Sequence, residues 1–148
     1  MKYALLALGV PAAALASATP ENPCRTKGKP SLCRPLTWTA QPQTNRAELP
    51  TAAQCQQLCS VVSGDAGDWS ANLTGATLSE KRGLVDGYPC HFSLGRGPGQ
   101  RDTLEVSLDD QDILYIIDGA VTKFGSGGKV AATGTMTCQG ENVTWWVD

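Results

Sequence analysis

The fold is decided by residues 109–146, which read DDQDILYIIDGAVTKFGSGGKVAATGTMTCQGENVTWW. Apolar residues recur in the first half with a helical period, which predicts an amphipathic helix with one buried face. That face consists of Ile113, Ile116, Ile117, Ala120, Val121 and Phe124. Asp109, Asp110 and Asp112 suit the positive end of the helix dipole, and Gly125 is expected to end the helix in a left-handed conformation. The three aspartates do not have the spacing of a calcium-binding EF-hand loop.

The glycine-rich turn 125–128 is followed by a change of period from helix to strand. Alternate residues of the next stretch share one face of a predicted strand, namely Val130, Ala132, Gly134, Met136 and Cys138. A tight loop then returns the chain as an aromatic strand through Trp145 and Trp146. One indole is expected in the core, whereas the second is either covered by the N-terminal arm or exposed as a contact site.

The first 18 residues have the pattern of a secretory signal peptide. Lys2 is the positive end, an apolar run follows, and Ala16-Ser17-Ala18 is a cleavage motif. Without Lys2 the chain carries 11 Lys and Arg against 14 Asp and Glu, a net charge of −3. We therefore expect a secreted, extracellular and monomeric product, and we expect no nucleic-acid partner.

The cysteines number six and all follow residue 18: Cys24, Cys33, Cys55, Cys59, Cys90 and Cys138. An even count in an exported chain predicts three disulfides. Cys55 and Cys59 are four residues apart on one face of a predicted helix, a spacing that disfavours a bond between them. We expect each to bond a different segment. A zinc site is the alternative, but it needs a reducing compartment.

Residues 19–50 are predicted to form a proline-rich arm with a basic start, made by Arg25, Lys27, Lys29 and Arg34. Within it, residues 36–39 have the character of a short strand. The first helix is expected to begin at Thr51, where Gln54 completes a capping box, and to end at Gly64.

The middle of the chain has weaker patterns. Residues 65–87 are predicted to be mostly loop, anchored by Trp69 and Leu73. A strand is expected over 88–94 and another over 104–108, joined as a hairpin by the loop 95–101. This loop is rich in glycine but lacks the lysine pattern of a phosphate-binding loop.

Only His91 offers the usual chemistry of a catalytic base. A small ribonuclease would combine it with Glu105 and with Arg96 or Arg101 on the predicted hairpin. Because the cysteines are expected to be oxidised and no nucleophile motif is present, a non-enzymatic protein is the favoured interpretation. No cofactor and no metal are expected.

Three further motifs concern processing. Asn72-Leu73-Thr74 and Asn142-Val143-Thr144 are acceptor sequences for N-linked glycosylation, with Asn72 placed in an exposed loop and Asn142 at a hairpin turn. Lys81-Arg82 is a dibasic pair that a protease of the export pathway could cut, although a solvated loop also explains it.

Three parts of the chain resemble the fungal necrosis-inducing-factor effector domain: the segments AAQCQQL and CHFSL and most of the last 40 residues. Proteins with this domain are relatives of the secreted "extracellular protein two" effector. The resemblance covers roughly residues 33–147 and is strongest in these features: Asp112-Ile113, Ile116, Ile117, Phe124, Lys129-Val130, Gly134 to Cys138, and Val143 to Trp145. It implies a secreted effector that acts on a host or a competitor. It also implies an α/β-sandwich similar to a killer toxin of smut fungi.

The resemblance further implies four cysteines common to the family, matched to Cys33, Cys55 or Cys59, Cys90 and Cys138. Cys24 and one helical cysteine are then additional, which suggests a bridge between Cys24 and the first helix.

The fold predicted is α+β: a two-layer sandwich over 51–148, with an antiparallel sheet of about five strands and two helices on one face. The predicted function is binding to a host or competitor protein or membrane component, with induction of cell death. The predicted contact surface comprises Arg96, Arg101, Trp146 and Trp38. The alternatives are a small hydrolase that uses His91 and a protective protein that binds wall polysaccharide through Trp146 or Trp38.

Overall fold

A computed structural model describes residues 21–26, 32–42, 48–65 and 67–148. The elements in chain order are β1 (Cys33–Pro35), β2 (Thr39–Ala40), α1 (Ala52–Gly64), β3 (Trp69–Asn72), β4 (Arg82–Val85), β5 (Phe92–Arg96), β6 (Glu105–Leu108), α2 (Asp110–Phe124), the short 3₁₀ turn η2 (Gly125–Gly127), β7 (Ala132–Cys138) and β8 (Glu141–Val147). The predicted signal peptide, 1–18, lies outside the described residues, as do parts of the 19–50 arm.

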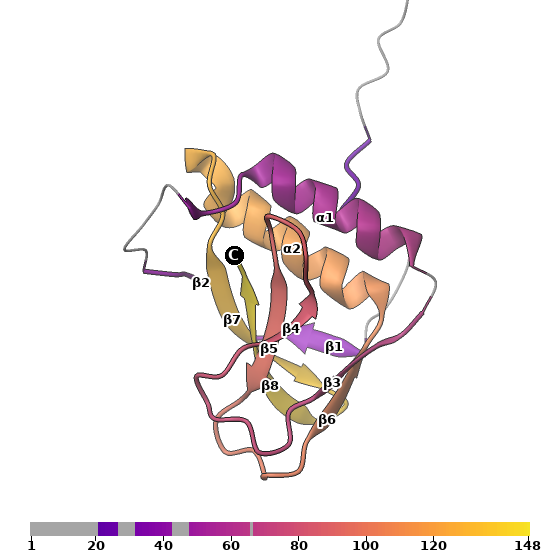
Figure 1. Cartoon of the computed structure of the whole chain (residues 1–148), viewed down its shortest axis with the longest axis vertical. Helices are drawn as coiled ribbons and strands as arrows, with labels where there is room; N and C mark the ends of the chain where they lie inside the picture. Colours follow the sequence, from indigo (N-terminus) through magenta and orange to yellow (C-terminus); the bar gives the residue numbers. More distant parts are fainter. Residues whose placement is uncertain (1–20, 27–31, 43–47, 66) are drawn as a thin grey trace, which may run out of the picture.

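The strands form two antiparallel sheets. The larger has six strands in the order β1-β7-β8-β5-β4, with β2 also paired to β7, and the smaller consists of β3 and β6. Figure 1 shows α1 and α2 side by side above the strands, and the two helices pack on each other. The α+β class is therefore confirmed, with eight described strands in two sheets rather than about five in one.

The α2–β7–β8 unit matches its prediction closely. Asp109 is the N-cap of α2, and it forms a capping box with Asp112. Residues of β7 alternate between buried and half-buried, as the period-two pattern requires. Gln139 and Gly140 have φ angles of 51° and 90°, which are typical of the two-residue turn that joins twisted antiparallel strands. Gly125 is not left-handed, because the chain continues into η2, and Gly128 takes the positive φ instead.

The predicted hairpin between 88–94 and 104–108 is wrong. The first strand begins only at Phe92, after a bend that contains Pro89, which lacks a backbone donor. β5 pairs with β4 and β8, whereas β6 pairs with β3 in the other sheet. The loop after β5 therefore connects two sheets and is not a hairpin loop.

Two other regions also differ from the prediction. Residues 65–87, expected to be mostly loop, contain β3 and β4, although Leu73 is fully buried and Trp69 packs on the core as predicted. The strand predicted over 36–39 is interrupted. The amides of Leu36 and Thr37 both donate to the carbonyl of Thr135, and the pairing with β7 shifts by one residue between β1 and β2, as in a β-bulge.

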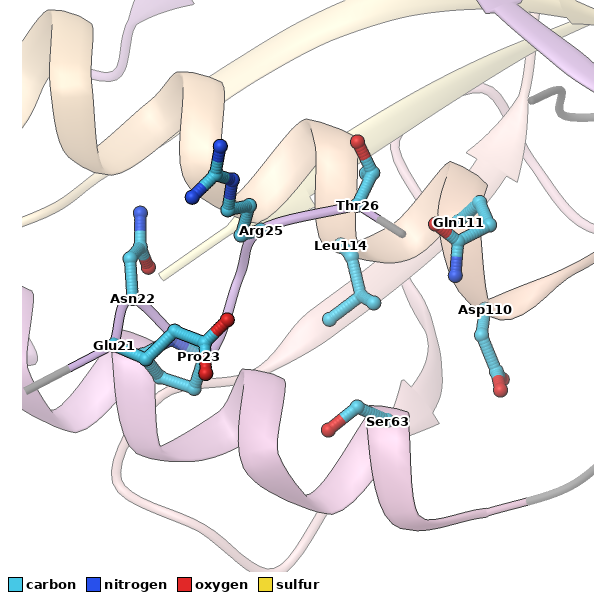
Figure 2. A pocket seen from close by; sticks show the side chains of 9 residues that line it. All are labelled: Glu21, Asn22, Pro23, Arg25, Thr26, Ser63, Asp110, Gln111 and Leu114. Atoms are coloured by element: carbon cyan, nitrogen blue, oxygen red, sulfur yellow. The ribbon is translucent and has the colours of Figure 1, made fainter. Parts of the chain in front are cut away.

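All six cysteines are paired, as Cys24–Cys59, Cys33–Cys138 and Cys55–Cys90. The two cysteines of α1 bond different segments, and Cys24 joins α1, as expected. Cys24 holds the segment 21–26, which Figure 2 shows running between α1 and α2. The side-chain amide of Asn22 adds a hydrogen bond of 2.9 Å to Asp118 of α2.

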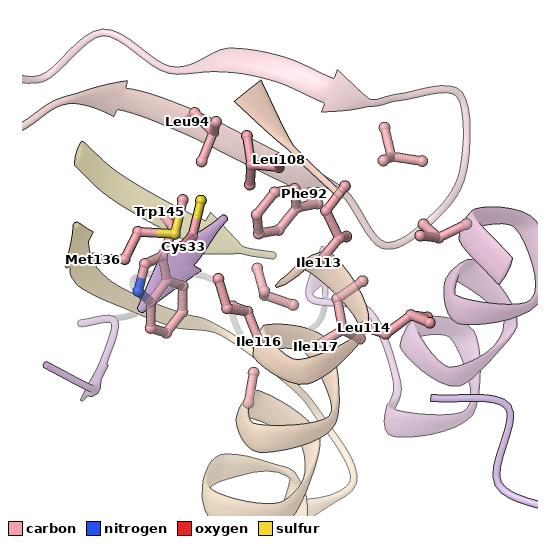
Figure 3. Packing of buried hydrophobic residues seen from close by; sticks show 14 of the residues in the cluster. Cys33, Phe92, Leu94, Leu108, Ile113, Leu114, Ile116, Ile117, Met136 and Trp145 are labelled. Atoms are coloured by element: carbon pink, nitrogen blue, oxygen red, sulfur yellow. The ribbon is translucent and has the colours of Figure 1, made fainter. Parts of the chain in front are cut away.

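The core lies between α2 and the larger sheet. Figure 3 shows Ile116 and Ile117 of α2 directed toward the side chains of Phe92 and Trp145. Trp145 and Phe92 are the largest side chains that are fully buried. Full burial of a side chain such as Phe92, Ile116 or Ile117 stabilises the fold by roughly 1.5–3 kcal/mol.

Asp112 fastens β1 to the start of α2. Its buried carboxylate accepts hydrogen bonds from the amides of Leu32 (3.0 Å), Cys33 (3.1 Å) and Asp109 (3.0 Å). Asp110 accepts from the indole N–H of Trp69 at 2.7 Å. The aspartates therefore serve capping and anchoring, and within the described residues no group of acidic, histidine or cysteine side chains could hold a metal ion.

Candidate contact surface

Trp38 lies in the bulge between β1 and β2, and its ring reaches Gly119 of α2. Its ring is 4.8 Å from that of Trp145 and 6.3 Å from that of Tyr115, both in edge-to-face geometry. The ammonium of Lys123 lies over the Trp38 ring, 5.7 Å from its centroid. We call Trp38, Tyr115 and Lys123 the aromatic patch. Trp38 is half-buried, whereas Tyr115 is 55% exposed, so the patch has a rigid base and an open rim.

Gly119 in the middle of α2 makes room for Trp38. A Cβ at this position would lie 2.7 Å from Cζ3 of Trp38 and closer still to Cη2. Glycine costs a helix about 1 kcal/mol relative to alanine, so its presence here is explained by the indole that it admits.

Gly119→Ala is therefore expected to have opposite effects on stability in the natural sequence and in a Trp38→Ala variant. In the natural sequence it displaces Trp38 and lowers the free energy of unfolding by about 1–3 kcal/mol. In a Trp38→Ala background the new methyl group enters empty space, and the same change raises that free energy by up to about 1 kcal/mol. Urea denaturation of the natural protein, of the two single variants and of the double variant measures both changes in the free energy of unfolding. Equal effects in both backgrounds would contradict the proposed contact.

Trp146 lies on the opposite face of β8 from Trp145. A Cβ on Gly95 would lie 2.7 Å from the Trp146 ring, so the indole rests on the backbone of β5. Lys81 places its ammonium 5.5 Å from the ring centroid and also pairs with Asp148. Trp146 is thus enclosed from both sides and half-buried, and offers a partner less surface than an outward tryptophan would.

The structure places Arg96 and Arg101 differently. The Arg96 guanidinium donates to the carbonyls of Ala76 (2.9 Å) and Gln100 (2.6 Å), and its side chain is only 13% exposed. Arg96 therefore links two loops from the inside of the protein, the one between β3 and β4 and the one between β5 and β6. Arg101 is 74% exposed and pairs with Glu141 at 2.7 Å, so it remains on the surface.

The residues proposed for a ribonuclease do not come together. His91 precedes β5, where its backbone pairs with that of Asp148, while Arg96 is the last residue of the same strand. Five residues of strand separate them by roughly 16 Å. Glu105 belongs to the smaller sheet, where it pairs with Asn72. The hydrolase alternative depended on the predicted hairpin, which the chain does not form.

A cavity that no sequence pattern predicts lies between the arm and the ends of the two helices. It has a volume of about 450 Å³, and Figure 2 shows its lining of Glu21, Asn22, Pro23, Arg25, Thr26, Ser63, Asp110, Gln111 and Leu114. Leu114 supplies an apolar floor, and charges of both signs surround it. The cavity exists because Cys24–Cys59 holds the arm against α1, a pairing that sequence spacing alone does not reveal.

The processing motifs lie at the surface. Asn72 is the last residue of β3 and Asn142 lies in β8 just after the hairpin turn, and both are exposed. Lys81 and Arg82 are also exposed, but Lys81 is paired with Asp148 and Arg82 with Glu80 at 2.7 Å. No helix within the described part of the chain is long and apolar enough to cross a membrane.

These features define a small α+β protein in which three disulfides fix a closed core and leave clusters of side chains on the surface. The chain belongs to the Hce2 family, whose description reads "Pathogen effector; putative necrosis-inducing factor" and whose model matches residues 32–138. This confirms the resemblance drawn from the sequence.

A curated protein of Penicillium expansum, named "Probable chitinase LysM18", is 27% identical over 143 residues. The match covers 90% of this chain but only 9% of that relative, so this chain corresponds to a small part of a much longer protein.

Proposed function

We propose that this protein is a secreted effector that binds a host or competitor target and induces cell death, and that it acts by binding rather than by catalysis. The observation that carries the proposal is the match of residues 32–138 to a pathogen-effector family. The pattern of a signal peptide over 1–18 and the three disulfides support an extracellular site of action, because disulfides persist in oxidising compartments.

The aromatic patch is the surface best suited to bind the target. Tyrosine and tryptophan supply large contact areas at low entropic cost, and they are enriched among the residues that dominate binding energy. Trp38 is already fixed by Gly119 and Trp145, so binding would cost little further ordering. Lys123 at the rim suits a target with acidic or aromatic groups, either a protein or a membrane component. The acidic net charge argues against nucleic acid.

The test is infiltration of the purified, oxidised protein into plant tissue and its addition to fungal cultures, with reduced and alkylated protein as the control. We expect cell death at a defined dose of the oxidised form and none with the reduced form, because the surface depends on the disulfide-held fold. Absence of a response in every recipient, together with no partner captured from extracellular fluid, would overturn the proposal.

A second function, binding of wall polysaccharide, is favoured by the relative whose printed name is that of a chitinase. Aromatic rings that could stack on sugars include the exposed Tyr115 and Tyr88 and the half-buried Trp38 and Trp146. Sedimentation with chitin and with β-glucan discriminates the two functions. Retention on chitin that Tyr115→Ala abolishes would favour this alternative, and full recovery in the supernatant would exclude it.

A further inference from the structure

We propose that the exported protein carries N-linked glycans on Asn72 and Asn142, and that the two glycans flank one surface loop, residues 97–104. This inference rests on the export that is part of the proposed function. The two glycans would mark one end of the molecule and would determine which part of the surface stays accessible to a target.

Asn72 presents a free amide nitrogen to solvent. It follows the buried Ala71 at the end of β3, and it is exposed as strand alternation requires. Its Oδ1 accepts from the amide of Thr74 at 3.0 Å, which turns Nδ2 away from the backbone. Among the described residues, no group bonds this nitrogen, so an attached sugar displaces no contact.

Asn142 has the same arrangement on the larger sheet. Its neighbour Val143 is fully buried, so Asn142 projects from the outer face of β8, away from the core. Its Oδ1 accepts from the hydroxyl of Thr137 at 3.0 Å, which fixes the amide plane. Within the part of the chain that is described, Nδ2 has no hydrogen-bond partner. The folded state therefore accommodates a glycan here as well.

Loop 97–104 links the two acceptor sites. The amide of Gly75, next to the first sequon, donates to the carbonyl of Asp102 at 2.9 Å. On the other side, the amide of Gly97 donates to the carbonyl of Asn142 at 3.0 Å. The loop that joins β5 to β6 lies at the lower end of Figure 1, away from both helices. Glycans on both sites would cover this end, including Arg101, and leave Tyr115 on α2 open.

The transfer needs an oligosaccharide carried on a lipid diphosphate, the donor class of the secretory pathway. The amide nitrogen of the asparagine forms a bond to the anomeric carbon of the sugar, and the bond from that carbon to the diphosphate oxygen breaks. The amide loses one proton, and the lipid diphosphate leaves. The hydroxyl of Thr74 or Thr144 completes each acceptor sequence.

The experiment expresses the full chain in a yeast secretory host, once behind its own residues 1–18 and once with a yeast leader in their place. Intact mass before and after treatment with peptide N-glycosidase counts the glycans on the exported protein. We expect two. Asn72→Gln and Asn142→Gln each remove one, Thr74→Ala removes the first, and Thr74→Ser, the matched control, retains it.

Exported protein whose mass shows no glycan would overturn the inference, and a single occupied site would overturn its two-site form. If the chain is exported only behind the yeast leader and carries two glycans, the inference stands and the failure counts against the proposed export alone.

Discussion

Gly134→Ala is expected to lower the free energy of unfolding by more than about 3 kcal/mol, at the upper end of the cost of overpacking a core. A Cβ at this position would lie 2.7 Å from Cε2 of Trp145 and would overlap the carbonyl oxygen of Thr37. That carbonyl cannot move away freely, because Thr37 is tied to β7 through hydrogen bonds with Thr135 at 2.9 and 3.2 Å. The new methyl group therefore meets a backbone and a buried indole at once.

The matched control is Gly64→Ala at the end of α1, where a Cβ meets nothing within 4 Å. This change should be neutral or should stabilise the protein by up to about 1 kcal/mol. Urea denaturation followed by tryptophan fluorescence measures both variants. Equal stability of Gly134→Ala and the natural protein would contradict the packing of Thr37 and Trp145 against Gly134.

Removal of the Cys33–Cys138 disulfide, by changing both residues to alanine, is the second large effect. The bridge joins residues 105 apart in sequence and closes the outer edge of the sheet, where the same two residues are register partners of β1 and β7. Loop-closure entropy for a loop of this size corresponds to about 4–5 kcal/mol. Such a loss approaches the whole net stability of a small domain, so the variant is expected to be largely unfolded at 37 °C.

The control is the corresponding double variant of Cys24–Cys59, whose cysteines are 35 residues apart. This bridge holds the segment 21–26, which also makes a hydrogen bond from Asn22 to Asp118 of α2. We expect its loss to release the arm and cost less than about 2 kcal/mol, because a segment with few contacts opens locally. Thermal unfolding of the two variants side by side makes the comparison, and a reversed order of stability would refute it.

The sequence predicts the C-terminal half well because its signals are local. The helix cap at Asp109 and the alternation from Ala132 to Cys138 depend on neighbours within a few residues. The β5–β6 hairpin failed because both partners are short alternating strands, and the sequence does not show that each pairs better with a distant strand.

The contact surface was less predictable, because it depends on contacts between residues that are far apart in the sequence. The sequence alone does not explain Gly119 within a helix or Gly134 within a strand, and only the tertiary structure shows that each accommodates an aromatic side chain. Likewise, the charge of Arg96 suggested a contact surface, whereas its guanidinium turns inward to the carbonyl of Ala76. Trp38, predicted to be part of the contact surface, is half-buried, and its aromatic partners come from α2 and β8.

We propose that this effector acts through a binding surface centred on the aromatic patch. The most direct test is the dose of oxidised protein that kills half of the infiltrated tissue, measured for Tyr115→Ala, Arg101→Ala and His91→Ala after near-UV circular dichroism has shown that each is folded. We predict that Tyr115→Ala raises this dose at least about tenfold, which corresponds to 1.4 kcal/mol of binding energy, and that the other two leave it unchanged. Loss of killing by His91→Ala, with Tyr115→Ala fully active, would contradict the claim and point to catalysis.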